Sequence, residues 1–455
     1  MRRAVLALIA ACHPSAPVAT TASGQTPRLV VLLVVDQWPE WAFEQKRPAL
    51  HGGFDRLLRE GAWHVGQHPS AATLTAAGHA LFGTGEPPAT SGILANEWWH
   101  RDLGKPLKAV EDVDGSVSAR WLRVPGIADV LAAEHPRAKA VSVSLKDRAA
   151  ILPLGHAGTP IWYDANKIAF VSMHPVPWLD DFNRAHPVSA HLHDVWTPLD
   201  AAKLAELSGV ADDRPQEVGH GGIGNTFPHA LADANKPAEA VLASPLGNDL
   251  VFDVATAAIE HDQLGADDVP DYLVVSLSAH DYVGHGWGQE SWEAWDMMLR
   301  LDARLQQFLE LLDRKVGAGR WVMIATSDHG ASPDPKSKIR YGDIKKAANT
   351  AAETELGAGD WIADARYPSV YFTDAALKAA GRDREVMIRK VVLALRAIPG
   401  LGRVERMADV AGHCDTRTGD AFAICLAVDP ERSGDIFYMP AEGTVMEDDD
   451  EPVTT

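Results

Sequence analysis

Residues 29–35 read LVVLLVV and are followed directly by Asp36. An uninterrupted run of Leu and Val is typical of a strand that is buried on both faces of a parallel sheet. Three further runs also end directly in polar residues; they are Ala140–Leu145 before Lys146-Asp147-Arg148, Tyr272–Leu277 before Ser278 to Asp281, and Trp321–Thr326 before Ser327-Asp328-His329. Ligands bind beyond the carboxyl ends of the strands in such sheets, so the pattern predicts that these polar residues converge on one site.

The segments between these runs have helical periodicity, as in Gly126–Glu134, Ser291–Arg314 and Arg384–Ile398. Alternating strands and helices predict an α/β fold with a largely parallel central sheet flanked by helices. Residues 163–244, rich in His, Pro, Trp and Asp, interrupt this alternation and predict a cap insertion over the site. The expected organisation is therefore a signal and tether (1–27), a first part of the catalytic core (28–162), the cap (163–244), a second part of the core (245–440) and an acidic tail (441–455).

The composition of the 455 residues narrows the class of protein. Hydrophobic residues make up 46%, which is ordinary for a globular protein, and the formal net charge is −20. A surface this acidic repels nucleic acid, so a nucleic-acid partner is not expected. The three cysteines are too few for a disulfide scaffold or a Cys-rich zinc module, although Cys414 and Cys425 could either pair or remain buried thiols.

The N-terminus is typical of an export signal. Met1-Arg2-Arg3 is basic, Ala4–Ala11 is apolar, and the run ends in IAAC with Cys12 as the residue that would be lipidated in a bacterial lipoprotein. The alternative is an ordinary secretory signal cut near Ala22. Both interpretations predict an exported protein, periplasmic or anchored to the outer membrane through a lipid on Cys12.

Carboxylates and imidazoles at the predicted strand ends form a candidate metal site. Asp281 and His285 lie four residues apart in SAHDYVGH, Asp328 and His329 are adjacent, and Asp36 ends the first strand. These oxygen and nitrogen ligands suit zinc, and manganese or iron are conceivable. A single Asp-His pair is more often a surface feature, but three such groups at strand ends predict metal. Two cations about 4 Å apart would clamp the attacking and leaving oxygens of an in-line displacement.

Thr75 is the candidate nucleophile. It opens the segment TAAGHALFGTG at the expected N-terminus of a helix, where positive potential favours an alkoxide and an anionic substrate. The alternative role for Thr75 is an N-cap. The small residues Ala76, Ala77 and Gly78 leave room for a tetrahedral group close to the backbone.

Three further residues are candidate ligands for an anionic substrate. Asn96 in GILANEWW can donate to an anionic oxygen, or can be a turn residue. On an extended segment Lys146 and Arg148 point to the same side, with Asp147 facing away, and fit two oxygens of a phosphoryl group. The alternative is an exposed basic pair.

Together these motifs resemble the phosphate-irrepressible alkaline phosphatases, threonine-nucleophile members of the alkaline phosphatase superfamily that are related to the type I phosphodiesterases. The matching segments are TAAGH, GILANEWW, SLKDRAAILP, SAHDYVGHGWG, SDHG, FPHAL and SPLGND. The resemblance implies an alkaline-phosphatase-like sandwich and a phosphomonoesterase with two zinc ions, acting through a covalent phosphothreonine.

Carried over to this chain, the resemblance implies a role for each candidate residue. Thr75 attacks phosphorus, one zinc is held by Asp36, Asp328 and His329 and activates the Thr75 oxygen, and the other is held by Asp281 and His285. Asn96, Lys146 and Arg148 hold the non-bridging oxygens, as expected for a monoesterase. None of the cysteines lies in the Cys-x-Pro-x-Arg context that a sulfatase relative requires.

One feature departs from the family pattern. In the family, the third ligand of the second zinc is a histidine that follows a segment like Arg432-Ser433-Gly434-Asp435. In this sequence the last histidine is His413, which precedes that segment. We therefore expect either a truncated core or a second zinc that lacks one ligand. His280, His220 or His413 are candidate substitutes, and the sequence does not distinguish them.

The expected substrates are small phosphate monoesters, handled by a monomer. Two alternative functions stay open at this point. One is a phosphodiesterase of the same superfamily, and the other is a non-catalytic lipoprotein that binds metal or phosphate.

Overall fold

A computed structural model describes residues 26–447, and Cys12 and the rest of the expected signal lie outside them. Its centre is a six-stranded sheet in the order β10-β1-β9-β4-β5-β6. The strands are β1 (Leu29–Val35), β4 (Ala140–Ser144), β5 (Thr159–Asp164), β6 (Ala169–Ser172), β9 (Asp271–Leu277) and β10 (Trp321–Thr326). All neighbours pair in parallel except β5 and β6. The four predicted strands are therefore present and adjacent, and the predicted fold class is confirmed.

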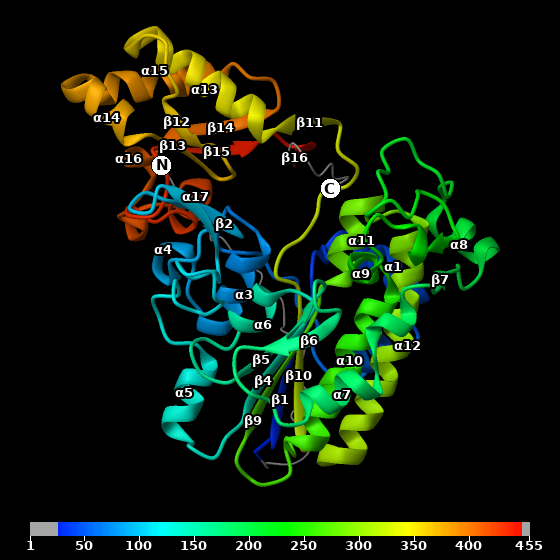
Figure 1. The fold of residues 1–455 in the computed structure, drawn as a ribbon. Helices are drawn as coiled ribbons and strands as arrows, with labels where there is room; N and C mark the ends of the chain where they lie inside the picture. The colour runs from blue at the N-terminus through cyan, green and yellow to red at the C-terminus, as the bar shows by residue number, and fades with distance from the viewer. Residues whose placement is uncertain (1–25, 448–455) are drawn as a thin grey trace, which may run out of the picture.

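Helices cover both faces of this sheet (Figure 1). In the view of Figure 1, α7, α10 and α12 lie on one side and α3, α5 and α6 on the other. Their bounds are α3 (Thr75–Thr84), α5 (Ile127–Glu134), α6 (Asp147–Ile151), α7 (Leu179–Ala185), α10 (Pro245–His261) and α12 (Trp292–Leu312). The predicted stripe of α12 is buried: Met298 and Leu305 belong to the same apolar core as the strands of the sheet, and Trp295 is buried beside Lys46. None of the helices in residues 26–447 is long and apolar enough to cross a membrane.

The edge strand β10 differs from its prediction. The pattern of the sequence predicts burial on both faces, as found for β1 and β9, but Val322 is 43% and Ile324 55% exposed. The reason is position, because only β1 pairs with β10 in the sheet. An apolar run alone does not reveal whether a strand is central or at an edge.

Residues 163–244 begin inside the central sheet, since β5 extends to Asp164 and β6 pairs with it. The remainder of the segment holds α7, α8 (Ala201–Ser208) and the two-stranded ladder of β7 (Val195–Trp196) with β8 (His229–Ala230). Its role as a cap over the site stays a prediction.

A smaller C-terminal lobe has its own sheet and its own apolar core. Its four strands are ordered β12-β13-β15-β14 and pair antiparallel; they are β12 (Ile362–Asp364), β13 (Ser369–Phe372), β14 (Leu401–Arg406) and β15 (Ile436–Pro440). The helices α13 (Tyr341–Leu356), α14 (Asp374–Ala380) and α15 (Arg384–Arg396) pack on this sheet, and β11 (Ser337–Arg340) pairs with β16 (Thr444–Glu447). Residues 245–440 are predicted to form the second part of the core, and within them this C-terminal lobe has a hydrophobic cluster of its own.

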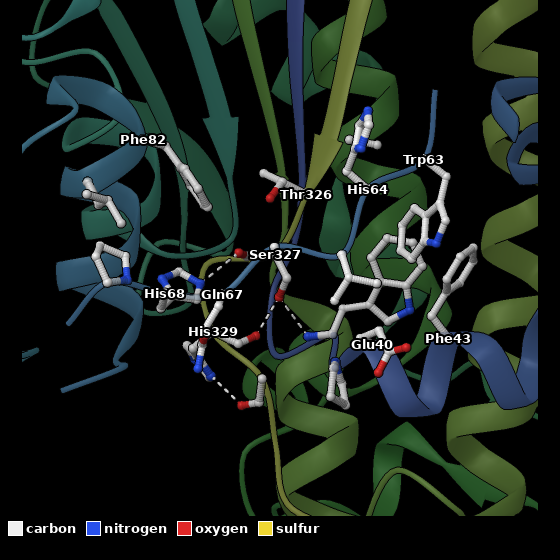
Figure 2. Close-up of a pocket in the computed structure, with 18 residues that line it drawn as sticks. Glu40, Phe43, Trp63, His64, Gln67, His68, Phe82, Thr326, Ser327 and His329 are labelled. Carbon is white, nitrogen blue, oxygen red and sulfur yellow. Dashed lines mark hydrogen bonds between the residues drawn. The ribbon is translucent and has the colours of Figure 1, made fainter. Parts of the chain in front are cut away.

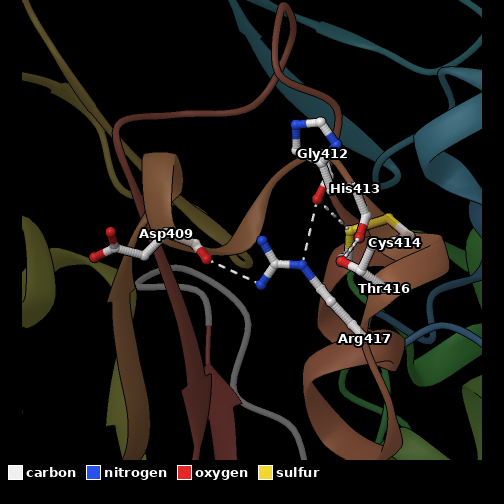
Figure 3. Close-up of a disulfide and its surroundings, with 7 residues drawn as sticks. Asp409, Gly412, His413, Cys414, Thr416 and Arg417 are labelled. Atoms are coloured by element: carbon white, nitrogen blue, oxygen red, sulfur yellow. Dashed lines mark hydrogen bonds between the residues drawn. A yellow bond between two sulfur atoms is a disulfide. The ribbon is translucent and has the colours of Figure 1, made fainter.

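Cys414 and Cys425 form a disulfide with 5.5 Å between their Cα atoms, which decides between the two alternatives left open by the sequence. The bond joins the segment before Thr416 to α17 (Gly419–Ala427). Figure 3 shows Arg417 beside it, donating to the carbonyls of Gly412 and Asp409.

Candidate active site

The ends of β1 and β10 bring three predicted metal ligands together. Asp36, Asp328 and His329 each offer one ligand atom, and these atoms all lie within 4.8 Å of one another. All three residues are buried. We call this group the first cation cluster. It is the only group of three such residues at this spacing in the described part of the chain.

The electrostatics of the first cation cluster suit a bound cation. Asp36 Oδ1 and Asp328 Oδ2 are buried with only a histidine nitrogen near each of them, His329 Nε2 at 3.3 Å and His79 Nδ1 at 3.2 Å, and burying such oxygens is costly unless positive charge lies beside them. Burial and the nearby charges of Asp281 and Asp328 raise the pKa of Asp36. Burial alone would lower the pKa of His329, but Asp328 and Asp36 raise it to about 10. The carboxylates thus stabilise positive charge at this point, and their oxygens with an imidazole nitrogen fit a divalent cation such as zinc.

Asp281 and His285 lie one turn apart on α11 (Ala279–Trp287), the helix that follows β9. His285 Nε2 is 3.2 Å from Asp281 Oδ1, an oxygen that is buried and accepts no hydrogen bond. The same oxygen lies 3.7 Å from His329 Nε2. The Asp281–His285 pair therefore lies directly beside the first cation cluster.

The three candidate substitutes for a further ligand lie in different places. His280 is buried and its Nδ1 bonds to the carbonyl of Asp36 at 2.9 Å. His220 lies on a glycine-rich loop, with its ring 5.3 Å from that of Tyr282. His413 lies beside the Cys414–Cys425 disulfide in the C-terminal part of the chain (Figure 3). The structure brings none of them into a group of three with the Asp281–His285 pair.

Thr75 is the first residue of α3, as predicted. Its Oγ1 is 3.5 Å from His329 Nε2, so the candidate nucleophile borders the first cation cluster. Asn96 Oδ1 accepts from the backbone N–H of Ala76 at 2.9 Å and thereby caps the helix beside Thr75. Gly78 also permits a close backbone contact, because a Cβ there would lie 2.2 Å from the carbonyl oxygen of Asp328. Its small size allows α3 to approach the loop that carries the ligands.

Lys146 is more deeply buried than binding of the substrate's phosphoryl oxygens alone would require. Its Nζ is 2.7 Å from Asp36 Oδ2 and 2.6 Å from Asp281 Oδ2, and it is 4% exposed. Burial alone would lower its pKa, but the charges of Asp281 and Asp36 raise it. The ammonium therefore bridges the first cation cluster and the Asp281–His285 pair.

The prediction that Lys146 and Arg148 share an extended segment is wrong for Arg148. Lys146 is extended, but α6 begins at Asp147, so Arg148 lies in the first turn of a helix. The two side chains remain close enough for the charge of Arg148 to oppose protonation of Lys146. Arg148 Nε is buried without a hydrogen-bond partner, so Arg148 has a donor that no protein group uses.

Sequence reasoning missed several residues that hold the ligands in place. His79 lies 3.2 Å from Asp328 Oδ2 and also bonds to the carbonyl of Thr75, and its ring is buried. Gln37 lies beside His285, Gln289 bonds to Gln37, and both glutamines are buried. The signals were present, since His79 is part of TAAGH and Gln37 follows Asp36 directly, but neither spacing nor residue type indicates which polar neighbour a buried side chain contacts.

A cavity of about 270 Å³ borders His329, and Figure 2 shows the residues that line it. Ser327 lies between the cavity and the ligand loop, where its Oγ accepts from the N–H of Trp38 at 2.8 Å and donates to the carbonyl of His329 at 2.5 Å. His68 Nε2 lies 3.2 Å from the carbonyl of Ser327. These bonds hold the strand-to-loop turn that lets Asp328 and His329 face the same point.

The chain belongs to the family described as type I phosphodiesterase / nucleotide pyrophosphatase, which it matches over residues 30–454. It is 37% identical over 331 residues to alkaline phosphatase PhoV of Synechococcus elongatus, a match that covers 68% of this chain and 60% of PhoV. It is 34% identical over 382 residues to alkaline phosphatase PafA of Elizabethkingia meningoseptica, covering 76% and 69% of the two chains. The chain thus spans less than two thirds of the length of PhoV.

The crystal structure of wild-type PafA superimposes with a TM-score of 0.86 at 30% identity, covering 95% of this chain and 88% of that one. These findings confirm the resemblance inferred from the motifs, both to the alkaline phosphatases and to the phosphodiesterase relatives.

Proposed function

We propose that this protein is a metal-dependent phosphomonoesterase that uses Thr75 as its nucleophile. One observation carries the proposal: the Thr75 hydroxyl, at the N-terminus of α3, lies 3.5 Å from His329 in a cluster of buried carboxylates and imidazole. The likeness to the alkaline phosphatases PhoV and PafA supports the same reaction class.

The reaction begins when Thr75 Oγ attacks phosphorus in line with the ester bond. The new Oγ–P bond forms while the ester P–O bond breaks, its electron pair leaves with the alcohol oxygen, and the Thr75 proton passes to solvent. The alcohol oxygen takes a proton from water. Water then attacks the phosphorus of phosphothreonine, the Oγ–P bond breaks, and Thr75 is reprotonated as inorganic phosphate is released.

Asn96, Lys146 and Arg148 bind the non-bridging oxygens in this proposal. Because Oδ1 of Asn96 caps α3, its amide nitrogen is the group that can donate to phosphate. Arg148 contributes a buried Nε without a protein partner. A dianionic group suits this charge better than a diester does, which favours a monoester substrate.

Asp36, Asp328 and His329 would hold one divalent cation, and Asp281 and His285 would take part in holding a second, with zinc the expected metal. Bound there, such cations lower the pKa of a coordinated hydroxyl and stabilise the charge on the attacking and leaving oxygens. The substrates are small phosphate monoesters. The protein is exported, as the basic and apolar N-terminal residues and the IAAC sequence at Cys12 suggest.

The test is hydrolysis of p-nitrophenyl phosphate and of bis-p-nitrophenyl phosphate, with zinc and after treatment with a chelator. We expect zinc-dependent turnover, a faster reaction with the monoester, and loss of at least about a thousandfold in Thr75→Ala. Thr75→Ser is the matched control because it keeps the hydroxyl. Faster cleavage of the diester would indicate a phosphodiesterase, and turnover that survives in Thr75→Ala would contradict the proposed nucleophile.

A mutation of Arg148 tests the preference for monoesters. Arg148→Ala removes a cation that a dianion needs more than a monoanion does, so we expect a larger loss of kcat/KM with the monoester than with the diester. The measurement is the ratio of the two losses. Equal losses would show that Arg148 does not distinguish the two substrates.

A further inference from the structure

Gln37 has a backbone conformation that is uncommon for its residue type. It follows the ligand Asp36 directly, and its φ is +59°, in the left-handed region. A left-handed residue other than glycine persists only where its surroundings fix it, and such residues cluster at functional sites. Here the Gln37 N–H donates to Asp328 Oδ1 at 3.2 Å, so the unusual turn supports a member of the first cation cluster.

The side chain of Gln37 reaches the other half of the site. Its Nε2 lies 3.1 Å from Nε2 and 3.3 Å from Nδ1 of His285, and the residue is 1% exposed. This side chain passes helix α11 at Gly284. A Cβ at that position would lie 1.8 Å from Gln37 Oε1, so only glycine leaves room for the glutamine. The contact with the helix therefore depends on both residue types.

Gln289 fixes the position of Gln37. Its Nε2 donates to the Gln37 carbonyl at 3.1 Å and to Gln37 Oε1 at 2.9 Å. Lys46 Nζ in turn donates to the carbonyl of Gln289 at 2.6 Å. Gln37 and Gln289 are almost fully buried, so these bonds do not compete with solvent.

We propose that Gln37 is a positioning residue that sets the geometry between the first cation cluster and the Asp281–His285 pair. Its backbone N–H donates to Asp328 and its side-chain amide packs against the His285 ring, with the amide nitrogen nearly equally far from both ring nitrogens, so one residue contacts both halves. The inference rests on the proposed function, in which both halves bind cations. Polar groups behind metal ligands commonly tune metal affinity by roughly 10–100-fold, which sets the size of the expected effect.

The experiment is a titration of the full chain with cobalt(II), followed by absorption spectroscopy, and a zinc-release assay with a chelator. Gln37→Gly removes the side chain while allowing the left-handed backbone. Gln37→Met keeps most of the volume that packs against the His285 ring but removes the amide, including the oxygen that accepts from Gln289. Gln263→Gly is the matched control, because Gln263 is an exposed glutamine with φ +54°.

We expect wild type and Gln263→Gly to bind two cobalt ions with the same spectrum. Both Gln37 variants should bind the first ion normally and the second at least about tenfold more weakly, with an altered spectrum at the second ion. If Gln37→Met does not fold, Gln37→Gly and Gln289→Met make the same comparison. Second-ion affinity and spectrum unchanged in the folded variants, or a wild type that binds only one ion, would overturn the role of Gln37 alone, whereas wild type that binds no cation would overturn the proposed function with it.

Discussion

The ammonium group of Lys46 lies in the interior, where it donates to the carbonyl of Gln289 and lies 5.2 Å from the centre of the Trp295 ring. Burial lowers its pKa to about 7, against 10.5 for an ordinary lysine. Between these two values the unfolded chain binds more protons than the folded one, so the free energy of unfolding increases as pH rises from about 7 to 10.5. Below pH 7 the cost of burying the charge is fully present.

We therefore expect Lys46→Met to stabilise the protein near pH 6 by a few kcal/mol, on the order of 1.4 kcal/mol per unit of pKa shift less about 1 kcal/mol for the lost hydrogen bond. The gain should shrink toward pH 10, where wild-type Lys46 no longer carries this cost. Urea unfolding at pH 6, 8 and 10 measures it. A difference that does not vary with pH would contradict the lowered pKa.

Among single residues, the predicted positions agree with the structure where a metal ligand or a nucleophile requires a particular residue type. Asp36, Asp328 and His329 were predicted to lie together because each follows a strand end, Thr75 was placed beside them by the family resemblance, and the structure brings all four together. The contacts of Gln37 could not be predicted, because an amide has no fixed partner until the chain is folded. The direction of Arg148 was missed for a simpler reason, since α6 begins at Asp147, inside the segment that the extended interpretation requires.

Helix α3 depends on Gly78 for its distance from the ligand loop. A methyl group there would lie 2.2 Å from the Asp328 carbonyl oxygen, and backbone at that point cannot rotate away as a side chain can. Gly78→Ala should therefore lower the free energy of unfolding by about 1–3 kcal/mol and reduce kcat about a hundredfold, because Thr75 moves relative to His329.

Gly66→Ala is the control for this prediction, since a Cβ at Gly66 meets no atom within 4 Å. Thermal unfolding and p-nitrophenyl phosphate kinetics on both variants make the comparison. Full activity in a folded Gly78→Ala would show that the approach of α3 to Asp328 does not set the reacting geometry.

Among the secondary-structure elements, the long and strongly patterned ones were predictable. Strands β1 and β10 and the start of α15 match the predicted bounds, and α12 differs by one residue at its start. The continuous apolar run of β1 and the helical periodicity of α12 and α15 reflect burial in the core, whereas β10 has an apolar run although part of it is exposed. The short ladder of β7 with β8 has only two residues in each strand, too few for a period to emerge.

At the scale of the whole molecule, ion pairs and hydrogen bonds join the C-terminal lobe to the main one. Arg101 bonds to Asp435 at 2.8 Å, Arg123 contacts Asp429, and Arg432 donates to the carbonyls of Gly92 and Trp121. Arg432 and Asp435 belong to the RSGD segment noted in the sequence. That segment thus holds the lobe against the main domain, which could not be predicted because it depends on contacts more than 300 residues apart along the chain.

The exposed apolar side chains of β10 predict a contact between copies of this protein. An edge strand with exposed apolar side chains is a template for pairing with another chain, and β10 exposes Val322 and Ile324. The chain was expected to be a monomer, but we predict association at high concentration through this edge, and Ile324→Lys should suppress it because a charge on an edge strand opposes pairing. Leu393→Lys is the control, because Leu393 is 63% exposed but lies on helix α15. Light scattering over a concentration series measures the effect, and equal association of the wild type and Ile324→Lys would exclude β10 as the contact.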